Sequence, residues 1–322
     1  MDGVLIIDKP EGLTSHDVVA AARRALRESR IGHTGTLDPL ATGVLPLAIG
    51  RATRLVRFLT ASDKDYLATI RFGATTDTYD ADGEETSRSD RHPDASQLAA
   101  AIAGLRGEYD QVPPPYSAKK IDGRRAYDLA RRREPVALAA APVRVSRADV
   151  ISFDGWIATV ALTCSAGFYV RSFAHSLGEA VGTGALLAGL QRTRSGDFRL
   201  DEATSLDALY GDADAPAARE GSHEAVLDWL IPLERLLPGF PAVTVTEEGR
   251  VWVGHGRELG VAQLLLEGKN GESADTSGSG LYGPTVTGQP EWTRLFDSDG
   301  HLLALATPGS MPGTLHPSVV LH

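Results

Sequence analysis

The stretch Gly32–Leu45, GHTGTLDPLATGVL, holds a single carboxylate between glycines. This residue, Asp38, stands directly before a proline, and such an aspartate often only shapes a turn by accepting hydrogen bonds from the next backbone amides. The glycines favour a second interpretation, since backbone without side chains can approach a ligand closely. A carboxylate that attacks carbon or takes a proton must stay ionised in poorly solvated surroundings, which requires a cation nearby. Asp38 is therefore a candidate catalytic residue.

The cation that best fits this requirement is Arg171, in the sequence FYVRS. An arginine can bind a carboxylate through two parallel hydrogen bonds, but spacing alone leaves this pairing a hypothesis. Two tyrosines, Tyr66 in KDYLATI and Tyr169 in GFYVR, could stack on a nucleobase or donate a hydroxyl in a pocket. Each could equally be an ordinary core tyrosine.

Metal and cofactor chemistry find little support in the sequence. His33 has no second histidine or carboxylate at ligand spacing. The segment TYDADG fails as a calcium loop, because Thr78 and Ser89 stand where the first and last ligands should be. The single cysteine, Cys164, lies in an apolar stretch typical of a buried strand. We expect no metal and no cofactor, and an aspartate-nucleophile hydrolase is disfavoured because nothing would activate its water.

Charge is distributed unevenly along the 322 residues. The formal net charge of -10 argues, taken alone, against a nucleic-acid partner. Binding depends on local patches, however, and basic residues gather in two segments. The first holds Arg51, Arg54 and Arg57 on an expected helix, and the second is Lys119–Arg133. Either segment alone could be a solvated surface, but two of them in an acidic chain favour RNA binding.

The elements that must position these residues mix strands and helices without a repeating βαβ rhythm. Buried or alternating apolar patterns predict strands over residues 3–9, 64–73, 143–153, 156–167 and 185–198. Helical periodicity and capping residues predict helices over 18–29, 52–60, 95–105, 123–133 and 169–182. Residues 75–86 are expected to form an acidic loop. This mixture predicts the α+β class, with a central mixed or antiparallel sheet.

Composition divides the chain into two expected domains. A catalytic domain is predicted over residues 1–209, a polar, proline-containing linker over 210–232, and a β-rich domain over 233–322. The glycine- and serine-rich insert at about 266–290 is not expected to order. No apolar stretch approaches the length that spans a bilayer, and the first residues lack the basic region of a cleavable signal. We therefore expect a cytoplasmic protein without a membrane partner.

Five segments, taken in order, resemble the bacterial TruB-type tRNA pseudouridine synthases. The resemblance covers about residues 3–196, and the stretch around Asp38 is close to diagnostic. It implies the pseudouridine synthase catalytic fold with a thumb-like segment over about 111–142 and, less closely, a PUA-like RNA-binding domain over 233–322. The matching segments are GVLIIDKPEGLTSHDVV, RIGHTGTLDPLATGVLPLAIGRATRL, KDYLATIRFGATTDTYDADG, QVPPPYSAKKIDGRRAYDLAR and GFYVRSFAHSLGEAVG.

The resemblance implies an isomerase that converts uridine 55 in the T-arm of tRNA to pseudouridine without cofactor or metal. The nucleotide must be flipped out of its stack to be reached. Its base is then detached from the ribose, turned, and rejoined through carbon. Asp38 would either attack the flipped nucleotide or take a ribose proton to give a glycal, and the sequence does not choose between these routes.

Further roles near the reacting base are implied position by position. Tyr66 would stack on the uracil and help to move a proton, and Arg171 would pair with Asp38. Tyr169 would contact the base edge. Other implied roles are an apolar wall for Leu190, occupation of the vacated base position for His33, and bracing of the catalytic loop for Lys9 with Pro10.

The resemblance also implies RNA contacts away from the base. Arg54 would contact a phosphate, and Asp80 would touch the RNA or order its own loop. Lys119 and Lys120 begin the mobile basic segment, ending at Arg133, that would clamp the T-arm. We expect tRNA as the partner, no protein partner, and a monomer.

A second class of function remains open, namely an RNA-binding folding helper that remodels tRNA without chemistry. The basic segments and the β-rich appendage would suffice for binding. The combination of Asp38, Tyr66 and Arg171 favours the isomerase, because a pure binding protein would not need it. The two roles can coexist.

Overall fold

The computed structural model describes residues 1–117, 120–121, 124–125, 138–210, 226–265 and 292–321. The chain divides into two compact units. The large unit comprises Leu5–Leu47 and Arg57–Trp229, and the C-terminal unit comprises Met1–Val4, Ala48–Val56 and Leu230–His322. Across the described residues, every helix is too short or too polar to cross a membrane.

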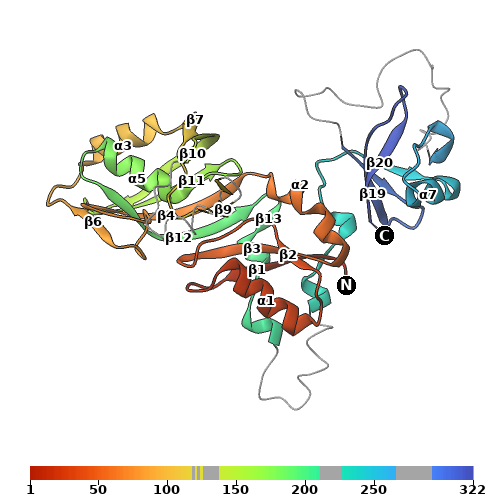
Figure 1. Ribbon diagram of the computed structural model, residues 1–322, viewed down its shortest axis with the longest axis horizontal. Helices are drawn as coiled ribbons and strands as arrows, with labels where there is room; N and C mark the ends of the chain where they lie inside the picture. Colours follow the sequence, from red (N-terminus) through yellow and green to blue (C-terminus); the bar gives the residue numbers. More distant parts are fainter. Residues whose placement is uncertain (118–119, 122–123, 126–137, 211–225, 266–291, 322) are drawn as a thin grey trace. The chain divides into compact units, whose positions relative to one another are not determined.

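The central element is a mixed sheet whose strands follow the order β14-β1-β3-β12-β4-β11-β10-β7 (Figure 1). Its strands are β1 (Gly3–Lys9), β3 (Ala41–Ile49), β4 (Lys64–Phe72), β7 (Gly107–Gln111), β10 (Ala141–Phe153), β11 (Ile157–Cys164), β12 (Ala185–Ser195) and β14 (Thr204–Ser205). Strand β12 runs parallel to β3 and antiparallel to β4, and the run β4-β11-β10-β7 is antiparallel. The predicted α+β class is confirmed.

Alternation of side chains explains the strands around the candidate site. Along β4, residues that are buried alternate with residues that are partly or fully exposed, so Tyr66 and Ala68 point into the core. Three short strands complete the sheet by pairing with β3, β12 and β1, respectively. They are β2 (Ile31–His33), β13 (Phe198–Arg199) and β15 (Ile231–Pro232).

Helix α1 (Ser15–Leu26) precedes the Asp38 loop. It begins at a capping box, in which the Thr14 side chain accepts from the Asp17 amide and the Asp17 carboxylate accepts from the Thr14 amide. Its apolar face buries Val18, Ala22 and other small residues. A helix was expected over 18–29, and it ends at Leu26 because Arg27 adopts the left-handed conformation.

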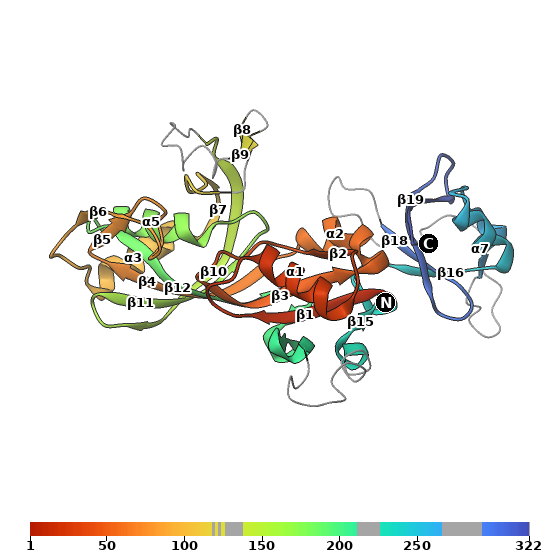
Figure 2. The same cartoon turned by 60° about the horizontal axis from the view of Figure 1, so that its bottom comes forward.

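Two further helices, α3 (Ala95–Gly104) and α5 (Val170–Ala180), cover one face of the sheet (Figure 2). Helix α5 packs mainly on β12 and carries Arg171 in its first turn. Its buried face includes Phe173, Ala174 and Leu177. The helices predicted over 95–105 and 169–182 are therefore confirmed in position.

Some predicted elements differ from the structure. The helix expected over 52–60 is a 3-10 helix, η1 (Gly50–Leu55), followed by one α-helical turn, α2 (Val56–Thr60). The expected helix over 123–133 is wrong at its start, because β9 (Arg124–Arg125) pairs with β8 (Lys120–Ile121). Residues 126–133 lie outside the described part. The expected loop over 75–86 begins and ends in a hairpin of β5 (Ala74–Thr76) and β6 (Glu85–Arg88).

The C-terminal unit has its own sheet, in the order β17-β16-β18-β19-β20. Its strands are β16 (Ala242–Val245), β17 (Leu264–Leu265), β18 (Thr293–Phe296), β19 (Leu302–Pro308) and β20 (Leu315–Val320). The sequence pattern of this region indicated strands only, and missed helix α7 (Glu247–Gly254), which the Thr246 side chain caps. Val253 of this helix packs into the core of the sheet beside Val245 and Leu295.

The first residues and most of η1 belong to the C-terminal unit and make hydrogen bonds and an ion pair within it. The Arg51 side chain donates to the Leu321 carbonyl (3.0 Å) and pairs with Asp2 (2.9 Å). The Arg54 side chain donates to the Val320 carbonyl. Most of the linker predicted over 210–232, and the insert predicted at 266–290, lie outside the described residues, so these domain boundaries remain predictions.

Candidate active site

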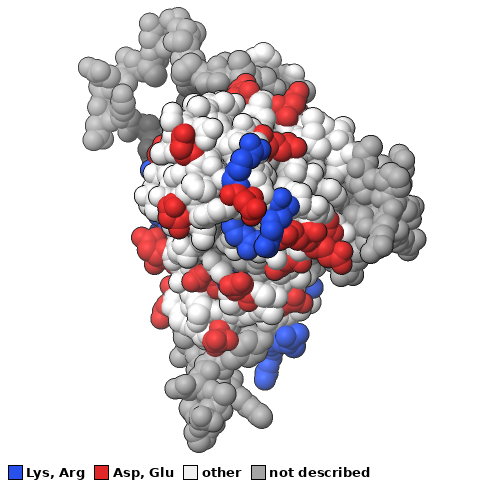
Figure 3. Space-filling model, turned by 90° about the vertical axis from the view of Figure 1, so that its left-hand side faces the viewer, with Lys and Arg blue, Asp and Glu red and all other residues white. Residues whose placement is uncertain are grey.

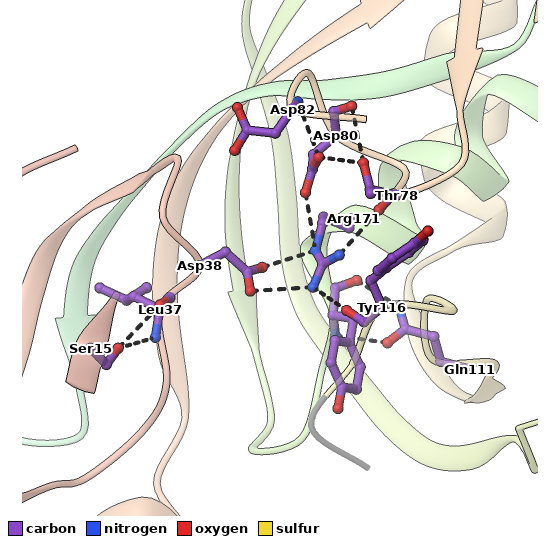
Figure 4. A network of polar contacts seen from close by, with 10 residues as sticks. Ser15, Leu37, Asp38, Thr78, Asp80, Asp82, Gln111, Tyr116 and Arg171 are labelled. Carbon is purple, nitrogen blue, oxygen red and sulfur yellow. Dashed lines mark hydrogen bonds and ion pairs between the residues drawn. The ribbon is translucent and has the colours of Figure 1, made fainter. Parts of the chain in front are cut away.

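Asp38 lies in the loop between β2 and β3 and faces Arg171 at the start of α5 (Figure 4). Arg171 Nη2 donates to Asp38 Oδ1 (3.2 Å), and Nε lies 2.9 Å from Oδ2. The guanidinium side chain is only 7% exposed, whereas the carboxylate side chain is 34% exposed. The pair therefore presents a reachable anion backed by a buried cation, a geometry suited to a carboxylate that must react.

Backbone carbonyls from two other segments fix the Arg171 guanidinium. Nη1 donates to the Thr78 carbonyl (3.1 Å), and Nη2 also donates to the Tyr116 carbonyl (2.9 Å). Because these acceptors take the outer donors, the edge formed by Nε and Nη2 is directed at Asp38 (Figure 4). The planar fork is thus held in one orientation by three separate parts of the chain.

A second carboxylate, Asp80, approaches the same guanidinium. Its Oδ2 lies 3.6 Å from Arg171 Nε. Oδ1 accepts from the Thr78 hydroxyl (2.5 Å) and from the Asp82 amide (3.2 Å). Burial raises the pKa of Asp80, and the bonds from Thr78 and the charge of Arg171 oppose that effect only in part. Asp80 is therefore a second, buried carboxylate beside the guanidinium that Asp38 binds.

The Asp80 loop is held by an unusual residue, Tyr79. Its φ of 67° lies in the left-handed region, which is rare for a bulky side chain. The Tyr79 ring stacks on His175, with centroids 3.8 Å apart and planes inclined by 6°. His175 lies one turn beyond Arg171 on α5. Helix α5 therefore contacts the loop through Arg171, which binds the Thr78 carbonyl, and one turn later through His175, which stacks on Tyr79. These contacts compensate for the strain of the Tyr79 backbone.

The loop that carries Asp38 is anchored on both sides of the carboxylate. The Ser15 hydroxyl donates to the Leu37 carbonyl (3.1 Å) and accepts from the Leu37 amide (2.8 Å). The Gly12 amide donates to the Pro39 carbonyl (2.8 Å). These bonds immobilise the residues immediately before and after Asp38, so that its side chain is the part of the loop tip that is left to react.

Lys9 lies fully buried beneath this loop. Its Nζ donates to the carbonyls of Pro10 (2.8 Å) and Pro39 (3.3 Å). Burial lowers the pKa of Lys9 to about 8, although the negative charge of Asp38 acts in the opposite direction. The position of Lys9 is consistent with the bracing role that the resemblance implied.

Tyr66 lies on β4, beside β12. It is 9% exposed, and its register partner on β12 is Arg192. Burial raises the pKa of the Tyr66 phenol, and the charge of Arg192 opposes this effect. Leu190 pairs with Ala41 of β3 and Ala68 of β4, so it lies two residues from Arg192 on the same face of β12.

Tyr169 is the residue before α5 and is bound by Gln111 at the end of β7. The Gln111 side chain accepts from the Tyr169 amide (2.8 Å) and donates to the Tyr169 carbonyl (3.0 Å). Val112 directly follows Gln111, and its carbonyl accepts a hydrogen bond from Ser172 Oγ (2.8 Å). Burial raises the pKa of the Tyr169 phenol. The chain leading into the expected thumb is thus fastened to the first turn of the helix that carries Arg171.

His33 lies at the end of β2, before the catalytic loop. Its Nδ1 accepts from the Gly35 amide (3.4 Å), and its ring meets His16 edge to face at 5.5 Å between centroids. Burial lowers the pKa of His33, with smaller contributions from the charges of His16 and Arg192. A neutral imidazole is therefore favoured at this position.

The structure does not bring every predicted site residue to Asp38. Arg54 belongs to the C-terminal unit and binds the Val320 carbonyl there. Lys119 lies outside the described residues, and Lys120 begins β8 without a described side chain. On the face that carries α3 and β6, Lys and Arg form a small group among Asp and Glu rather than a continuous basic surface (Figure 3).

Sequence reasoning missed several residues that build the site. Ser15, Gln111 and Tyr116 are not among the predicted site residues, although they bind Leu37, Tyr169 and Arg171, respectively. Arg192 was not considered, although a signal existed, because it shares the side of its strand with Leu190. A charged residue at an inward-facing strand position is rare unless it has buried partners.

Comparisons with known proteins show the family to which the chain belongs. Residues 23–170 match the family model described as TruB family pseudouridylate synthase, N-terminal domain. A protein named tRNA pseudouridine synthase B from Solibacter usitatus (strain Ellin6076) is 45% identical over 260 residues, which cover 80% of this chain and 86% of that protein. Its namesake from Mycobacterium sp. (strain KMS) is 46% identical over 268 residues, covering 81% and 86%.

A solved structure shares the fold. The archaeal box H/ACA Nop10–Cbf5 complex contains a chain that superposes with a TM-score of 0.68 at 24% identity, covering 99% of this chain and 86% of that one. This likeness concerns the fold alone, whereas the curated relatives are similar over most of their length. The chain therefore belongs to the TruB family of pseudouridylate synthases and is an isomerase, as the sequence motifs predicted.

Proposed function

We propose that this chain converts uridine 55 in the T-arm of tRNA to pseudouridine, with Asp38 as the catalytic residue. The curated relatives are named tRNA pseudouridine synthase B, which supports tRNA as the substrate. The observation that carries the proposal is the Asp38–Arg171 pair, because its carboxylate is open and its guanidinium is buried. No other acid among the described residues near Arg171 is as exposed, since Asp80 is 7% exposed.

The reaction requires the bond between C1′ and N1 of the uridine to break and a bond from C1′ to C5 to form. In one route an Asp38 oxygen attacks C1′ and is later displaced by C5. In the other, Asp38 takes the C2′ proton as the base leaves and returns it when C5 adds. In either route the C5 proton is lost and N1 gains one, so that atoms balance. Arg171 stabilises the carboxylate and holds it towards the flipped nucleotide.

The remaining site residues serve the base. Tyr66 stacks on the uracil and helps to move a proton, and burial raises the pKa of its phenol. Tyr169 contacts the base edge and Leu190 forms an apolar wall. His33, whose neutral form is favoured, occupies the position that the flipped base leaves. Asp80 orders its loop against Arg171.

RNA binding relies on local contacts in an acidic chain. The segment of residues 111–142, with Lys119 and Lys120, clamps the T-arm, and Arg54 contacts a phosphate. The C-terminal unit acts as a PUA-like RNA-binding domain. We further propose a monomeric, cytoplasmic protein with no protein partner. Affinity should fall with added salt, because phosphate contacts release counterions.

Pseudouridine mapping on an unmodified T-arm stem-loop, incubated with purified protein and no additives, tests this function. Wild type should convert the single T-loop uridine, and Asp38→Asn should lose that activity while binding the RNA with unchanged affinity. Loss of affinity to the same extent as activity would contradict the catalytic assignment. A tRNA-refolding assay with Asp38→Asn tests the folding-helper role, which this variant should retain if the role exists.

A further inference from the structure

Arg192, in the middle of β12, is one of the largest fully buried side chains of the protein, at 1% exposure. In the described part of the chain it takes part in no ion pair. Burying a cation without an anion is unfavourable unless its donors find good acceptors. The contacts that offset this cost therefore show what Arg192 is for.

Those contacts are two backbone carbonyls at the ends of the catalytic loop. Arg192 Nε donates to the Val44 carbonyl (2.7 Å), and Nη2 donates to the Gly35 carbonyl (3.1 Å). The two acceptors enclose residues 36–43, with Asp38 among them. One guanidinium thus ties together the two chain segments that enter and leave the loop. We call this crossing the neck of the Asp38 loop.

Close packing at the neck reinforces these hydrogen bonds. Gly43 is the parallel register partner of Arg192, and a Cβ at Gly43 would lie 2.2 Å from the Arg192 carbonyl oxygen. Gly43 also has a φ of 96°, which other residues rarely adopt. A Cβ at Gly35 would lie 3.4 Å from Arg192 Nη1. Gly43 therefore lets the loop close onto Arg192, whereas a Cβ at Gly35 would make only an ordinary contact.

On its other side, β12 pairs with β4, which carries Tyr66. Tyr66 is the register partner of Arg192, and the charge of Arg192 opposes the larger effect of burial, which raises the pKa of the Tyr66 phenol. Arg192 is therefore bonded to the frame of Asp38 and paired in register with the aromatic residue proposed to hold the uracil. A shift of about 1 Å between reacting groups can lower a rate by about 100-fold, so such a link has a direct consequence for the chemistry.

We infer that Arg192 is a positioning residue, which closes the neck of the Asp38 loop and fixes Tyr66 relative to it. This inference rests on the proposed function. Arg192 acts through Asp38 and Tyr66 and does not itself touch the nucleotide. Its loss should lower the rate of the chemical step and leave RNA affinity unchanged.

The test compares Arg192→Met and Arg192→Lys with the matched control Lys64→Met. Lys64 is also a buried cation of this sheet, at 6% exposure, and it also donates to backbone carbonyls, those of Thr60 (2.5 Å) and Ser62. These acceptors belong to the end of α2 and the turn after it. Lys64→Met therefore reproduces the loss of a buried cation without opening the neck.

The readouts are the single-turnover rate of pseudouridine formation on T-arm RNA, the Kd for that RNA, and the melting temperature. Arg192→Met should lower the rate by about 100-fold with Kd within about twofold of wild type. Arg192→Lys keeps the charge and one donor, so it should recover part of the rate. Lys64→Met should lower the melting temperature while the rate of the folded enzyme stays within about threefold.

Three results would overturn the inference: a wild-type rate in Arg192→Met, an increase in Kd as large as the loss of rate, or an equal loss of rate in Lys64→Met. Should Arg192→Met fail to fold, Arg192→Lys decides by the same criteria. If the wild-type protein makes no pseudouridine, the proposed function fails instead. Hydrogen–deuterium exchange then still tests the neck. Relative to wild type, the amides of residues 35–44 should exchange faster in Arg192→Lys, and their exchange rates should be unchanged in Lys64→Met.

Discussion

Arg171 and Asp38 form an ion pair in which the two partners differ fivefold in exposure, 7% against 34%. An exposed pair would be screened by water and would contribute little. A fully buried pair could not reach a nucleotide. Here the cation is immobilised by the carbonyls of Thr78 and Tyr116, and only the anion faces outward. The pair therefore combines a fixed geometry with an accessible reactive group.

Replacement of this arginine tests whether the fork geometry matters. Arg171→Lys should lower the rate of pseudouridine formation by at least about 100-fold, because an ammonium cannot satisfy Asp38 and two carbonyls in one plane. RNA affinity should change little. Single-turnover kinetics with a parallel Kd measurement check this. A rate near that of wild type would refute the role of the two-point contact.

Ser15 offers a test of the loop anchor, with its neighbour as the control. Ser15→Ala removes both hydrogen bonds to Leu37 and leaves a buried amide and carbonyl without that partner. We expect a loss of about 1–3 kcal/mol in the free energy of unfolding, together with a lower rate. Thr14→Ala removes the helix cap and should cost about 1 kcal/mol without affecting the rate of the folded enzyme. Equal rates in the two variants would contradict the anchoring role.

The stack of Tyr79 on His175 predicts a difference between aromatic and aliphatic replacements. His175→Leu should free the strained Tyr79 backbone and loosen the carbonyl of Thr78 from Arg171, lowering the rate by about tenfold. His175→Phe preserves an aromatic ring and should keep most of the rate. Denaturant unfolding accompanies the kinetics, so that a general loss of stability can be separated from a loss of catalysis. Identical rates in both variants would refute the stacking role.

Lys9 predicts a particular pH dependence of stability. The pKa of Lys9 is about 8 in the folded protein and 10.5 for an unperturbed lysine, so the unfolded chain binds more protons between these two pH values. Stability of the wild type should therefore rise with pH across that window, relative to Lys9→Met, by at most about 3 kcal/mol. Below pH 8 the difference should be constant. Urea unfolding of both proteins from pH 7 to pH 10.5 measures it, and parallel curves throughout would show that Lys9 is not desolvated.

Several elements could be predicted from the sequence because their signals are local. The alternation of β4, the pair of strands β10 and β11 around Asp154–Gly155, and the apolar face of α5 all follow from side-chain period. Helix α7 could not be predicted in this way. Its sequence, EEGRVWVG, contains glycine and residues that favour strands, and the Thr246 cap together with packing of Val253 decides in favour of a helix.

The sequence by itself determined the candidate chemistry. An acid in a loop bounded by glycines, and the order of the five motifs, led to Asp38 and to the family. The tertiary structure decided which residues serve that acid. Arg171 lies 133 residues from Asp38 along the chain, and Arg192 lies 157 residues from Gly35. Such contacts depend on sheet register and on helix packing, which no local pattern encodes, so the partners of buried polar residues such as Ser15 and Arg192 emerged only from the fold.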